Sequence, residues 1–398
     1  MRIGKSLESE FSPRPSTRSE ALGLSGIRVI FEKVAKIPDA IRLEFGEPDF
    51  DTPTNIKAAA IDAIRQGKTK YSSSAGIPEL RKAIASKFKQ DNGIEYEPLK
   101  EIIVTAGATA GINQALLATV DVGDEVLVPD PGWATYLHAV NITGAKPVLY
   151  PLHEKSGYAV EVENLKKNLT RKTRALLINT PSNPMGSSLT RRNLEKIAEF
   201  AIKHNLVVLS DEVYEKFLYE DIVGNEHVSI ASLNEMKDRV VTINAFSKTY
   251  AMTGWRIGYV GAPEPIVAAM TKINAATSSC VSTVNQYAGL EALNGPQNSV
   301  SKMISAFSER RQVLVKGLRE FPGFKCAMPS GAFYAFPNMT ETGLTSEKLA
   351  MKIVEEAHVA VVPGSAFGNE GEGYLRLAYA NSVENIQEAL TRMKNILG

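Results

Sequence analysis

Three short apolar runs decide the fold: ALLI at residues 175–178, LVVL at 206–209 and VVTI at 240–243. Amphipathic helical stretches separate these runs. Three further apolar runs lie at residues 102–105, 126–128 and 257–260. Strands that are apolar throughout and alternate with helices are typical of a largely parallel sheet with helices on both faces. We therefore predict an α/β fold built on such a sheet.

The last hundred residues follow a different pattern. A long helical stretch at 300–321 is followed by short apolar runs at 332–336, 359–362 and 374–378, and a final helix begins after Ser382. A length of 398 residues also suits two domains. We predict a large domain at 46–295, a smaller α+β domain at 296–398, and a segment at 1–45 that packs on the small domain or on a partner subunit.

Composition excludes several classes of protein. The 45 basic and 44 acidic residues give a net charge of +1, which argues against nucleic acid as a main partner. Two cysteines are too few for a disulfide framework or a cysteine zinc site, and they suit a reducing compartment. The first 20 residues are polar, and no stretch has the length and apolarity of a membrane span. We expect a cytoplasmic protein with no membrane partner.

Several well-known catalytic motifs are absent. No Gly-x-Gly-x-x-Gly follows a strand, so the dinucleotide-binding fingerprint is missing. The five histidines never form His-Glu-x-x-His, and there is no Gly-x-Ser-x-Gly nucleophile elbow. Dehydrogenase, metalloprotease and hydrolase interpretations lose their support, and we expect no metal site.

Polar residues follow the apolar runs, where a parallel sheet binds its ligands. Asp211 follows the run at 206–209, and Lys248 follows the run at 240–243 with Arg256 soon after. Taken singly, such a lysine is most often a surface residue and such an aspartate a helix cap. Together they suit pyridoxal phosphate, which needs an amine for its aldehyde, a carboxylate for its ring nitrogen and a cation for its phosphate.

Six segments extend this pattern in chain order: FGEPDF at 45–50, Tyr71 with AGIPELR at 75–81, SNP at 182–184, SDEVY at 210–214, residues 247–258, and YLRL at 374–377. With these segments the chain resembles the class I and II pyridoxal-phosphate-dependent aminotransferases of fold type I, especially the aspartate and aromatic amino-acid branch. The resemblance extends from about Gly46 to Ala380.

The resemblance implies a role for each residue around the cofactor ring. Lys248 would bond to the cofactor aldehyde and then carry the proton of the substrate α-carbon. Asp211 would pair with the ring nitrogen, which makes the ring an electron sink. Tyr214 and Asn183 would hydrogen-bond the ring oxygen, and Trp133 would stack on the ring face. Lys248, Asp211 and Tyr214 form the implied catalytic set.

The resemblance also implies a phosphate site at a helix N-terminus, where free backbone N–H groups and the helix dipole attract anions. The remaining residues implied for the cofactor are Gly107, Ala108, Thr109, Ser247, Arg256 and, from the neighbouring subunit, Tyr71. A residue supplied by the neighbour implies a homodimer with shared active sites.

The implied substrates are an amino acid and a keto acid. Arg376 would hold the substrate α-carboxylate through two parallel hydrogen bonds, for which a guanidinium suits well. Gly46, Trp133 and Asn183 complete the implied substrate site. The implied reaction moves an amino group from an L-amino acid, aspartate or aromatic, to 2-oxoglutarate in two half-reactions.

Three positions depart from the family pattern. Ala245 replaces a phosphate-binding serine of some members, and Met185 stands where threonine is common. Thr109 stands where some aspartate-using members carry a lysine for the side-chain carboxylate. A strict preference for acidic substrates is therefore left open.

Four alternative functions can be weighed against this one. A β-lyase or a broad-specificity aminotransferase of the alanine or kynurenine type would need the same lysine and aspartate. An aminotransferase-like regulator would need a DNA-binding module, and the 45 residues before Gly46 have no helix-turn-helix pattern. A non-catalytic scaffold is disfavoured because Lys248, Asp211, Arg256 and Arg376 are all present.

Overall fold

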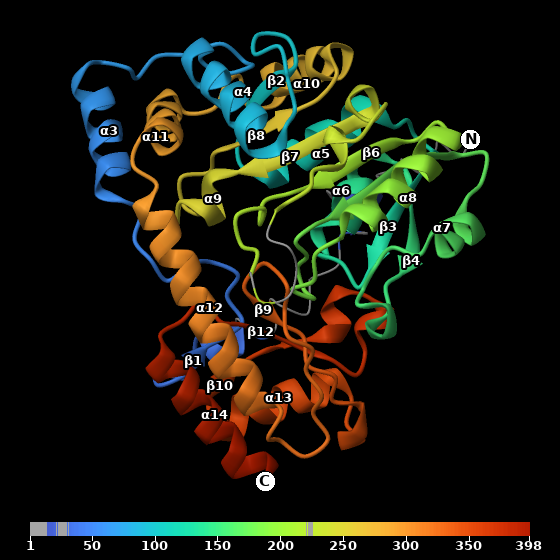
Figure 1. Cartoon of the computed structure of the whole chain (residues 1–398), viewed down its shortest axis with the longest axis vertical. Coiled ribbons are helices and arrows are strands. Elements are labelled where there is room, and N and C mark those ends of the chain that lie inside the picture. The colour runs from blue at the N-terminus through green and yellow to red at the C-terminus, as the bar shows by residue number, and fades with distance from the viewer. Residues whose placement is uncertain (1–13, 21, 23–29, 31, 220, 222–225) are drawn as a thin grey trace, which may run out of the picture.

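A seven-stranded sheet forms the centre of the larger part of the chain (Figure 1). The computed structural model describes residues 14–20, 22, 30, 32–219, 221 and 226–398. The strands follow the order β2 (Ile102–Thr105), β8 (Gly258–Gly261), β7 (Val240–Ala245), β6 (Val207–Asp211), β5 (Thr173–Asn179), β3 (Glu125–Asp130) and β4 (Lys146–Pro151). Strand β8 runs antiparallel to both neighbours and the other pairs are parallel, which confirms the predicted largely parallel sheet.

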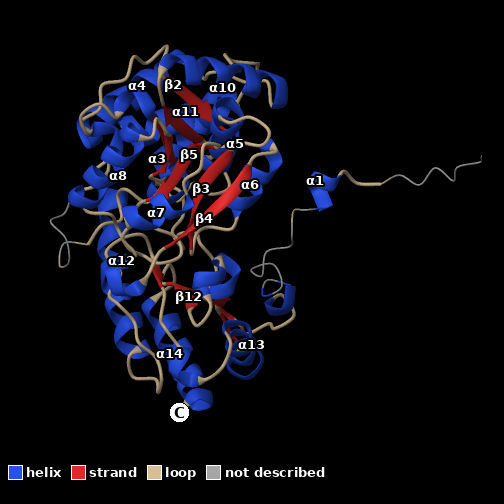
Figure 2. Cartoon of the chain, turned by 90° about the vertical axis from the view of Figure 1, so that its right-hand side faces the viewer, coloured by secondary structure: helices blue, strands red, loops and turns tan. Residues whose placement is uncertain are grey.

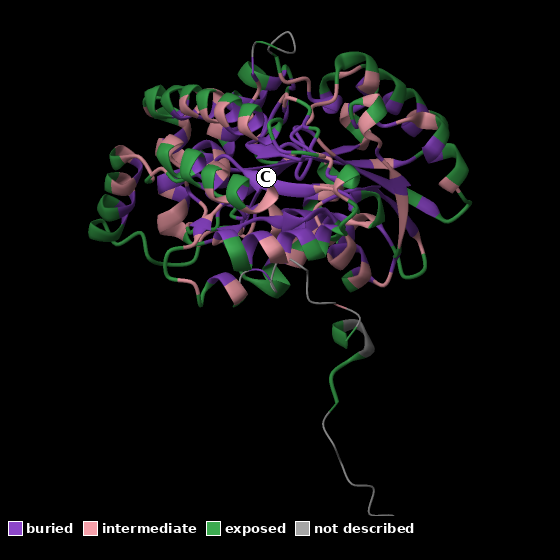
Figure 3. Ribbon diagram, turned by 90° about the horizontal axis from the view of Figure 1, so that it is seen from below, coloured by how far each residue is buried: buried purple, intermediate pink, exposed green. Residues whose placement is uncertain are grey.

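Helices cover both faces of this sheet, so its strands are buried on both sides (Figures 2 and 3). Successive side chains of a strand point to opposite faces. In β5, Leu176 packs into one core with helices α4 (Pro78–Asn92) and α8 (Arg191–Lys203). Leu177 packs into another core with α5 (Ala108–Thr119), α6 (Thr135–Thr143) and α10 (Glu264–Thr277). Val208 and Leu209 of β6 divide in the same way. This explains why both positions of each pair are apolar.

The helices of the larger part are α3 (Thr54–Arg65), α4 (Pro78–Asn92), α5 (Ala108–Thr119), α6 (Thr135–Thr143), α7 (Val162–Asn168), α8 (Arg191–Lys203), α9 (Phe246–Thr249), α10 (Glu264–Thr277) and α11 (Thr283–Asn294). The short α1 is Thr17–Glu20. Thr190, a residue type that the sequence alone marks as a helix cap, caps α8 in a capping box with Asn193. Ser382 caps the last helix, which begins where the sequence predicts. No helix in the described part of the chain is long and apolar enough to cross a membrane.

The last hundred residues form a smaller α+β part, drawn below the sheet in Figure 1. Its antiparallel sheet has the order β11 (Val362–Pro363), β12 (Leu375–Ala378), β9 (Tyr334–Ala335), and β10 (Val359–Ala360) pairs with β1 (Ile41–Arg42). The helices are α12 (Asn298–Leu318), α13 (Ser346–Ala357) and α14 (Val383–Leu397). Among the described residues before 45, Ile30, Val34 and Leu43 join the core of this part.

The predicted domain boundary near 295 stays a prediction, because helix α12 contributes residues to the cores of both parts of the chain. Val300 in its first turn belongs to the core of the large sheet, whereas Phe307 belongs to the core of the smaller part.

Strand β4 is absent from the sequence prediction. Its sequence, KPVLYP, carries a lysine and two prolines, and it lies at the sheet edge, where proline costs no ladder hydrogen bond.

Candidate active site

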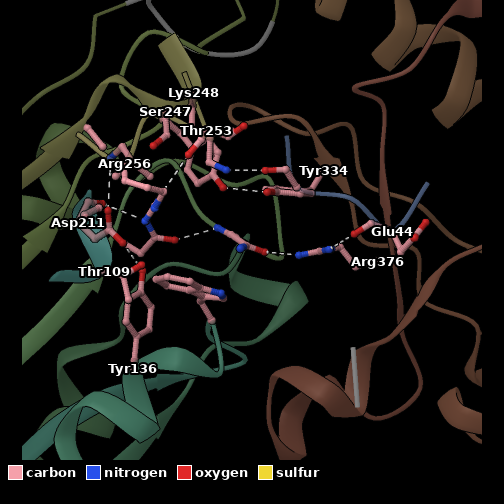
Figure 4. A pocket seen from close by; sticks show the side chains of 18 residues that line it. Glu44, Thr109, Tyr136, Asp211, Ser247, Lys248, Thr253, Arg256, Tyr334 and Arg376 are labelled. Carbon is pink, nitrogen blue, oxygen red and sulfur yellow. Dashed lines mark hydrogen bonds between the residues drawn. The ribbon is translucent and has the colours of Figure 1, made fainter. Parts of the chain in front are cut away.

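A cavity of about 310 Å³ lies at the carboxyl ends of β5, β6 and β7, facing the smaller part (Figure 4). Of the residues predicted from the sequence, those that line it are Gly46, Ala108, Thr109, Trp133, Asn183, Asp211, Tyr214, Ser247, Lys248, Arg256 and Arg376. The structure thus brings together side chains that lie up to 330 residues apart in the sequence. Gly107 is not part of the lining but directly precedes Ala108 in the chain, and Tyr71 lies away from the cavity.

Asp211 is the last residue of β6, and its side chain is buried against the floor of the cavity. The phenol of Tyr136 donates a 2.6 Å hydrogen bond to Asp211 Oδ2, and the backbone N–H of Val213 lies 3.4 Å from Oδ1. Burial raises the pKa of Asp211 to about 6, although both hydrogen bonds lower it. A cationic partner in the cavity would therefore stabilise the ionised form of this buried carboxylate.

Lys248 lies in the short helix α9 that follows β7. Its Nζ donates to the backbone carbonyl of Gly46 and faces the cavity (Figure 4). Burial, together with the nearby charges of Arg376 and Arg256, lowers the pKa of Lys248 to about 8, against the opposing charges of Glu47 and Asp211. A neutral amine is the nucleophilic form, so this site favours attack on a carbonyl.

Arg256 and the N-terminus of α5 form the cationic end of the cavity. Arg256 has a φ of +52° and its Nη1 donates to the carbonyl of Thr253 at 2.9 Å. Gly107, the N-cap of α5, has a φ of +82°, and a Cβ there would lie 2.6 Å from Arg256 Nη2. No side chain caps α5. Its N-terminal N–H groups, the Thr109 hydroxyl and the guanidinium together suit an anion.

Arg376 of β12 marks the other end of the cavity. Its Nη1 donates to Asn183 Oδ1 at 3.0 Å and its Nη2 to the backbone carbonyl of Glu44. The rings of Tyr334 and Phe367 lie 4.7 and 4.9 Å from the guanidinium carbon. Within the described part of the chain, Nε has no hydrogen-bond partner. The guanidinium is thus held in place and retains capacity for a carboxylate.

The sequence model of one family, aminotransferase class I and II, matches residues 38–393. The chain belongs to the class I and II aminotransferases. It is 46% identical over 384 residues to an aspartate aminotransferase of Pyrococcus abyssi, which covers 96% of this chain and 98% of the relative. It is 44% identical to aromatic-amino-acid aminotransferase 2 of Thermococcus litoralis, with the same coverage.

A solved structure, the aspartate aminotransferase of Thermus thermophilus with maleate, superposes with a TM-score of 0.92 at 37% identity. The match covers 97% of this chain and 100% of that one. The family and fold type I inferred from six short segments are therefore confirmed.

Four aromatic side chains of this aminotransferase line the cavity beside the charged groups: Trp133, Tyr136, Tyr214 and Tyr334. Trp133 lies edge to face with Tyr136, with 5.5 Å between ring centroids and 87° between planes. The hydroxyls of Tyr214 and Tyr334 are 2.8 Å apart. Burial raises the pKa of Tyr214 well above its usual value, so the phenol keeps its proton.

Seven residues of the cavity lie outside the set predicted from the sequence: Glu44, Tyr136, Asn179, Val213, Ala245, Thr253 and Tyr334. Tyr136 lies three residues after the predicted Trp133, at the start of α6, and this closeness in the sequence was an available signal. Nothing in the sequence separates Tyr334 from other buried aromatic residues. Glu44 precedes the FGEPDF segment and is fully buried, and burial raises its pKa.

Tyr71 lies outside the cavity and is 88% exposed. It shares a shallow surface depression with Lys70, Cys280 and Thr283. Its predicted contact is with the phosphate site of a neighbouring subunit, and that contact stays a prediction.

A buried group behind Asp211 has the residue types of a metal site: Glu212, Glu215 and His227. Lys87 pairs with Glu215, Asn92 donates to it at 2.9 Å, and His227 Nε2 lies 2.8 Å from Glu212 Oε2. Because protein groups already satisfy these carboxylates, the cluster is an ionic network that supports the end of β6.

Proposed function

We propose that this aminotransferase uses pyridoxal phosphate to move an amino group from aspartate or an aromatic amino acid to 2-oxoglutarate. The observation that carries the proposal is one cavity that holds a desolvated lysine and a buried aspartate between two arginines. The names of the relatives support both classes of donor.

The residues present fit the cofactor. The position of Gly107 matters most, because any side chain there would collide with the guanidinium of Arg256 and fill the anion site. Lys248 would hold the cofactor covalently through its aldehyde, and Trp133 would cover its ring. Asp211 would pair with the ring nitrogen, and Asn183 and Tyr214 would bond the ring oxygen. When bound, pyridoxal phosphate withdraws electrons from the substrate α-carbon.

The chain's own groups then move the proton and orient the substrate. Lys248, whose pKa is about 8, is well matched to accept the proton of the α-carbon near neutral pH and to return it. Arg376, stacked between two rings, fixes the substrate α-carboxylate and thereby the direction of the α-proton. Asp211 would keep a proton on the ring nitrogen of the bound cofactor by its negative charge.

Aspartate and aromatic donors differ in whether the enzyme must bind a second, side-chain carboxylate. In the described lining the cations are Lys248, Arg256 and Arg376, and all three have roles in the proposal. Thr109 adds no charge where a lysine would bind a side-chain carboxylate. Aspartate therefore requires a cation from outside this lining, for example from a second subunit, whereas an aromatic donor does not.

The experiment is a panel of amino donors with 2-oxoglutarate, run with wild type and with Lys248→Ala. We expect glutamate formation with aspartate or aromatic donors and no multiple turnover in Lys248→Ala. Full turnover by that variant would overturn the assignment of Lys248. Release of pyruvate and ammonia from a cysteine conjugate without a keto acid would instead support the β-lyase alternative.

We also propose a homodimer with shared active sites, supported by the exposed Tyr71. In a mixed dimer of Tyr71→Ala and Lys248→Ala chains, one site regains both intact residues. Mixing the two inactive or weakly active variants is expected to raise activity above either alone. No gain after verified subunit exchange would contradict a shared site.

Cys280 and Cys326 are free, in keeping with the predicted cytoplasmic location.

A further inference from the structure

Asp130 joins the large sheet to the smaller part of the chain beside the active site. It is the last residue of β3, and its side chain is buried. Its Oδ2 accepts the backbone N–H of Asn369 at 3.2 Å, and Oδ1 accepts that of Glu370 at 3.1 Å. Both amides belong to the short 3₁₀ helix Asn369–Gly371 of the smaller part.

The loop that meets Asp130 is shaped for this contact. Gly368 has a φ of +130°, a conformation that residues with a side chain rarely adopt. A Cβ on Gly368 would lie 2.0 Å from Asp130 Oδ1, so any other residue would push the carboxylate away. A second hydrogen bond joins the same two segments, from the N–H of Gly132 to the carbonyl of Phe367 at 2.8 Å.

Each side of this contact carries a residue of the cavity. On the sheet side, Trp133 follows Asp130 by three residues and lines the cavity. On the other side, the ring of Phe367 lies 4.9 Å from the guanidinium carbon of Arg376. The contact therefore joins the segment of Trp133, which would cover the cofactor ring, to the segment of Phe367. Phe367 packs on Arg376, which would hold the substrate carboxylate.

We propose that Asp130 is a positioning residue that sets the distance between Arg376 and Trp133 through the loop 367–370. This inference rests on the proposed function, because it assigns the substrate carboxylate to Arg376. We call the contact of Asp130 with the amides of Asn369 and Glu370 the Asp130 latch. Its donors are backbone amides, whose direction is fixed by the loop, so it constrains position more tightly than a pair of long side chains.

The test compares Asp130→Asn with Asp124→Asn. Asp124 lies just before β3, at the opposite end of this strand, and its Oδ2 accepts the N–H of Asp121 at 2.9 Å. An asparagine at 130 keeps the size but removes the charge, and it turns an amide donor toward backbone donors. We expect the KM for donor and keto acid to rise about tenfold, since charge-assisted hydrogen bonds are about twice as strong as neutral ones. We expect kcat to fall less than threefold, and no change in Asp124→Asn.

Calorimetric titration with maleate, an unreactive dicarboxylate, separates the inference from the proposed function. We expect maleate to bind about tenfold more weakly to Asp130→Asn than to wild type, and equally well to Asp124→Asn. If wild type binds maleate but transfers no amino group, the proposed function fails while the latch is still tested. Unchanged maleate affinity and KM in a folded Asp130→Asn would overturn the inference.

A second variant covers the case in which Asp130→Asn does not fold. Gly368→Ala leaves Asp130 intact but displaces it from the loop, so it is expected to raise KM in the same direction. The absorbance of the bound cofactor should stay as in wild type, because no group that holds it is changed. A variant with normal KM and only a lower Tm would assign the latch to stability alone and would overturn the proposal.

Discussion

The hydrogen bond from Tyr136 to Asp211 makes a prediction for Tyr136→Phe. The phenol oxygen lies 2.6 Å from Asp211 Oδ2, and both side chains are buried. Phenylalanine fills the same space and removes one donor. Because the donor stabilises the ionised carboxylate, its loss raises the pKa of Asp211 from a value that burial already places at about 6.

The size of the effect follows from the burial of the pair. A hydrogen bond to a charged group contributes about 1.5–3 kcal/mol. At about 1.4 kcal/mol per pKa unit, the pKa of Asp211 rises by about one to two units. Since the proposed role of Asp211 requires its negative charge, turnover at pH 7 is expected to fall with the ionised fraction of Asp211, about two- to tenfold. The acid limb of the pH profile is expected to move upward by about one to two units.

The assay is the pH dependence of kcat/KM and the dissociation constant of pyridoxal phosphate, for Tyr136→Phe and for Tyr150→Phe. Tyr150 is equally buried in the same sheet region, but its hydroxyl donates to the carbonyl of Leu177 at 2.8 Å. The control is expected to lose about 1 kcal/mol of stability and to keep the wild-type pH profile. If the acid limb of Tyr136→Phe also stays in place, Tyr136 does not tune Asp211 and the reasoning is refuted.

Three further predictions concern single residues. In cofactor-free enzyme, the rate of covalent capture of pyridoxal phosphate by Lys248 should rise with pH, reach half its maximum near pH 8 and level off about one pH unit higher, because the neutral amine reacts; a stopped-flow rate that keeps rising toward pH 10 would contradict the lowered pKa. Arg376→Lys removes paired hydrogen bonds and the stacking on two rings, so steady-state kinetics should give a kcat/KM about 10- to 150-fold lower, and an unchanged value would exclude Arg376 as the carboxylate ligand. Thr190→Ala removes the capping box of α8 and should cost about 1 kcal/mol in urea unfolding without changing KM; an unaltered midpoint would mean that the cap adds nothing.

The polar residues that follow the strands were predictable because parallel strands have their carboxyl ends at the same edge of the sheet. Lys248, Asp211 and Asn183 each follow an apolar run, so chain order alone predicts that they meet. Helix caps such as Thr190 and Ser382 were predictable for a similar reason, since a cap acts on amides only three residues away. The strand β4 escaped prediction because a lysine and two prolines leave it only a short apolar run.

The supporting residues were not predictable. Tyr136, Tyr334 and Phe367 are ordinary aromatic residues in the sequence, and their roles come from which charged group each one touches. The Asp130 latch joins residues about 240 positions apart, and no local pattern marks either end.

The sequence by itself determined six of the seven strands of the large sheet, the family and the polar residues that follow the strands, because hydrophobic period and strand-end polarity act over a few residues. Only the tertiary structure decided how those groups are tuned. Lys248 and Asp211 are a common amine and a common carboxylate until the packed protein removes water from them, which moves their pKa values to about 8 and about 6. Desolvation depends on every neighbour at once, and the neighbours are set by the fold.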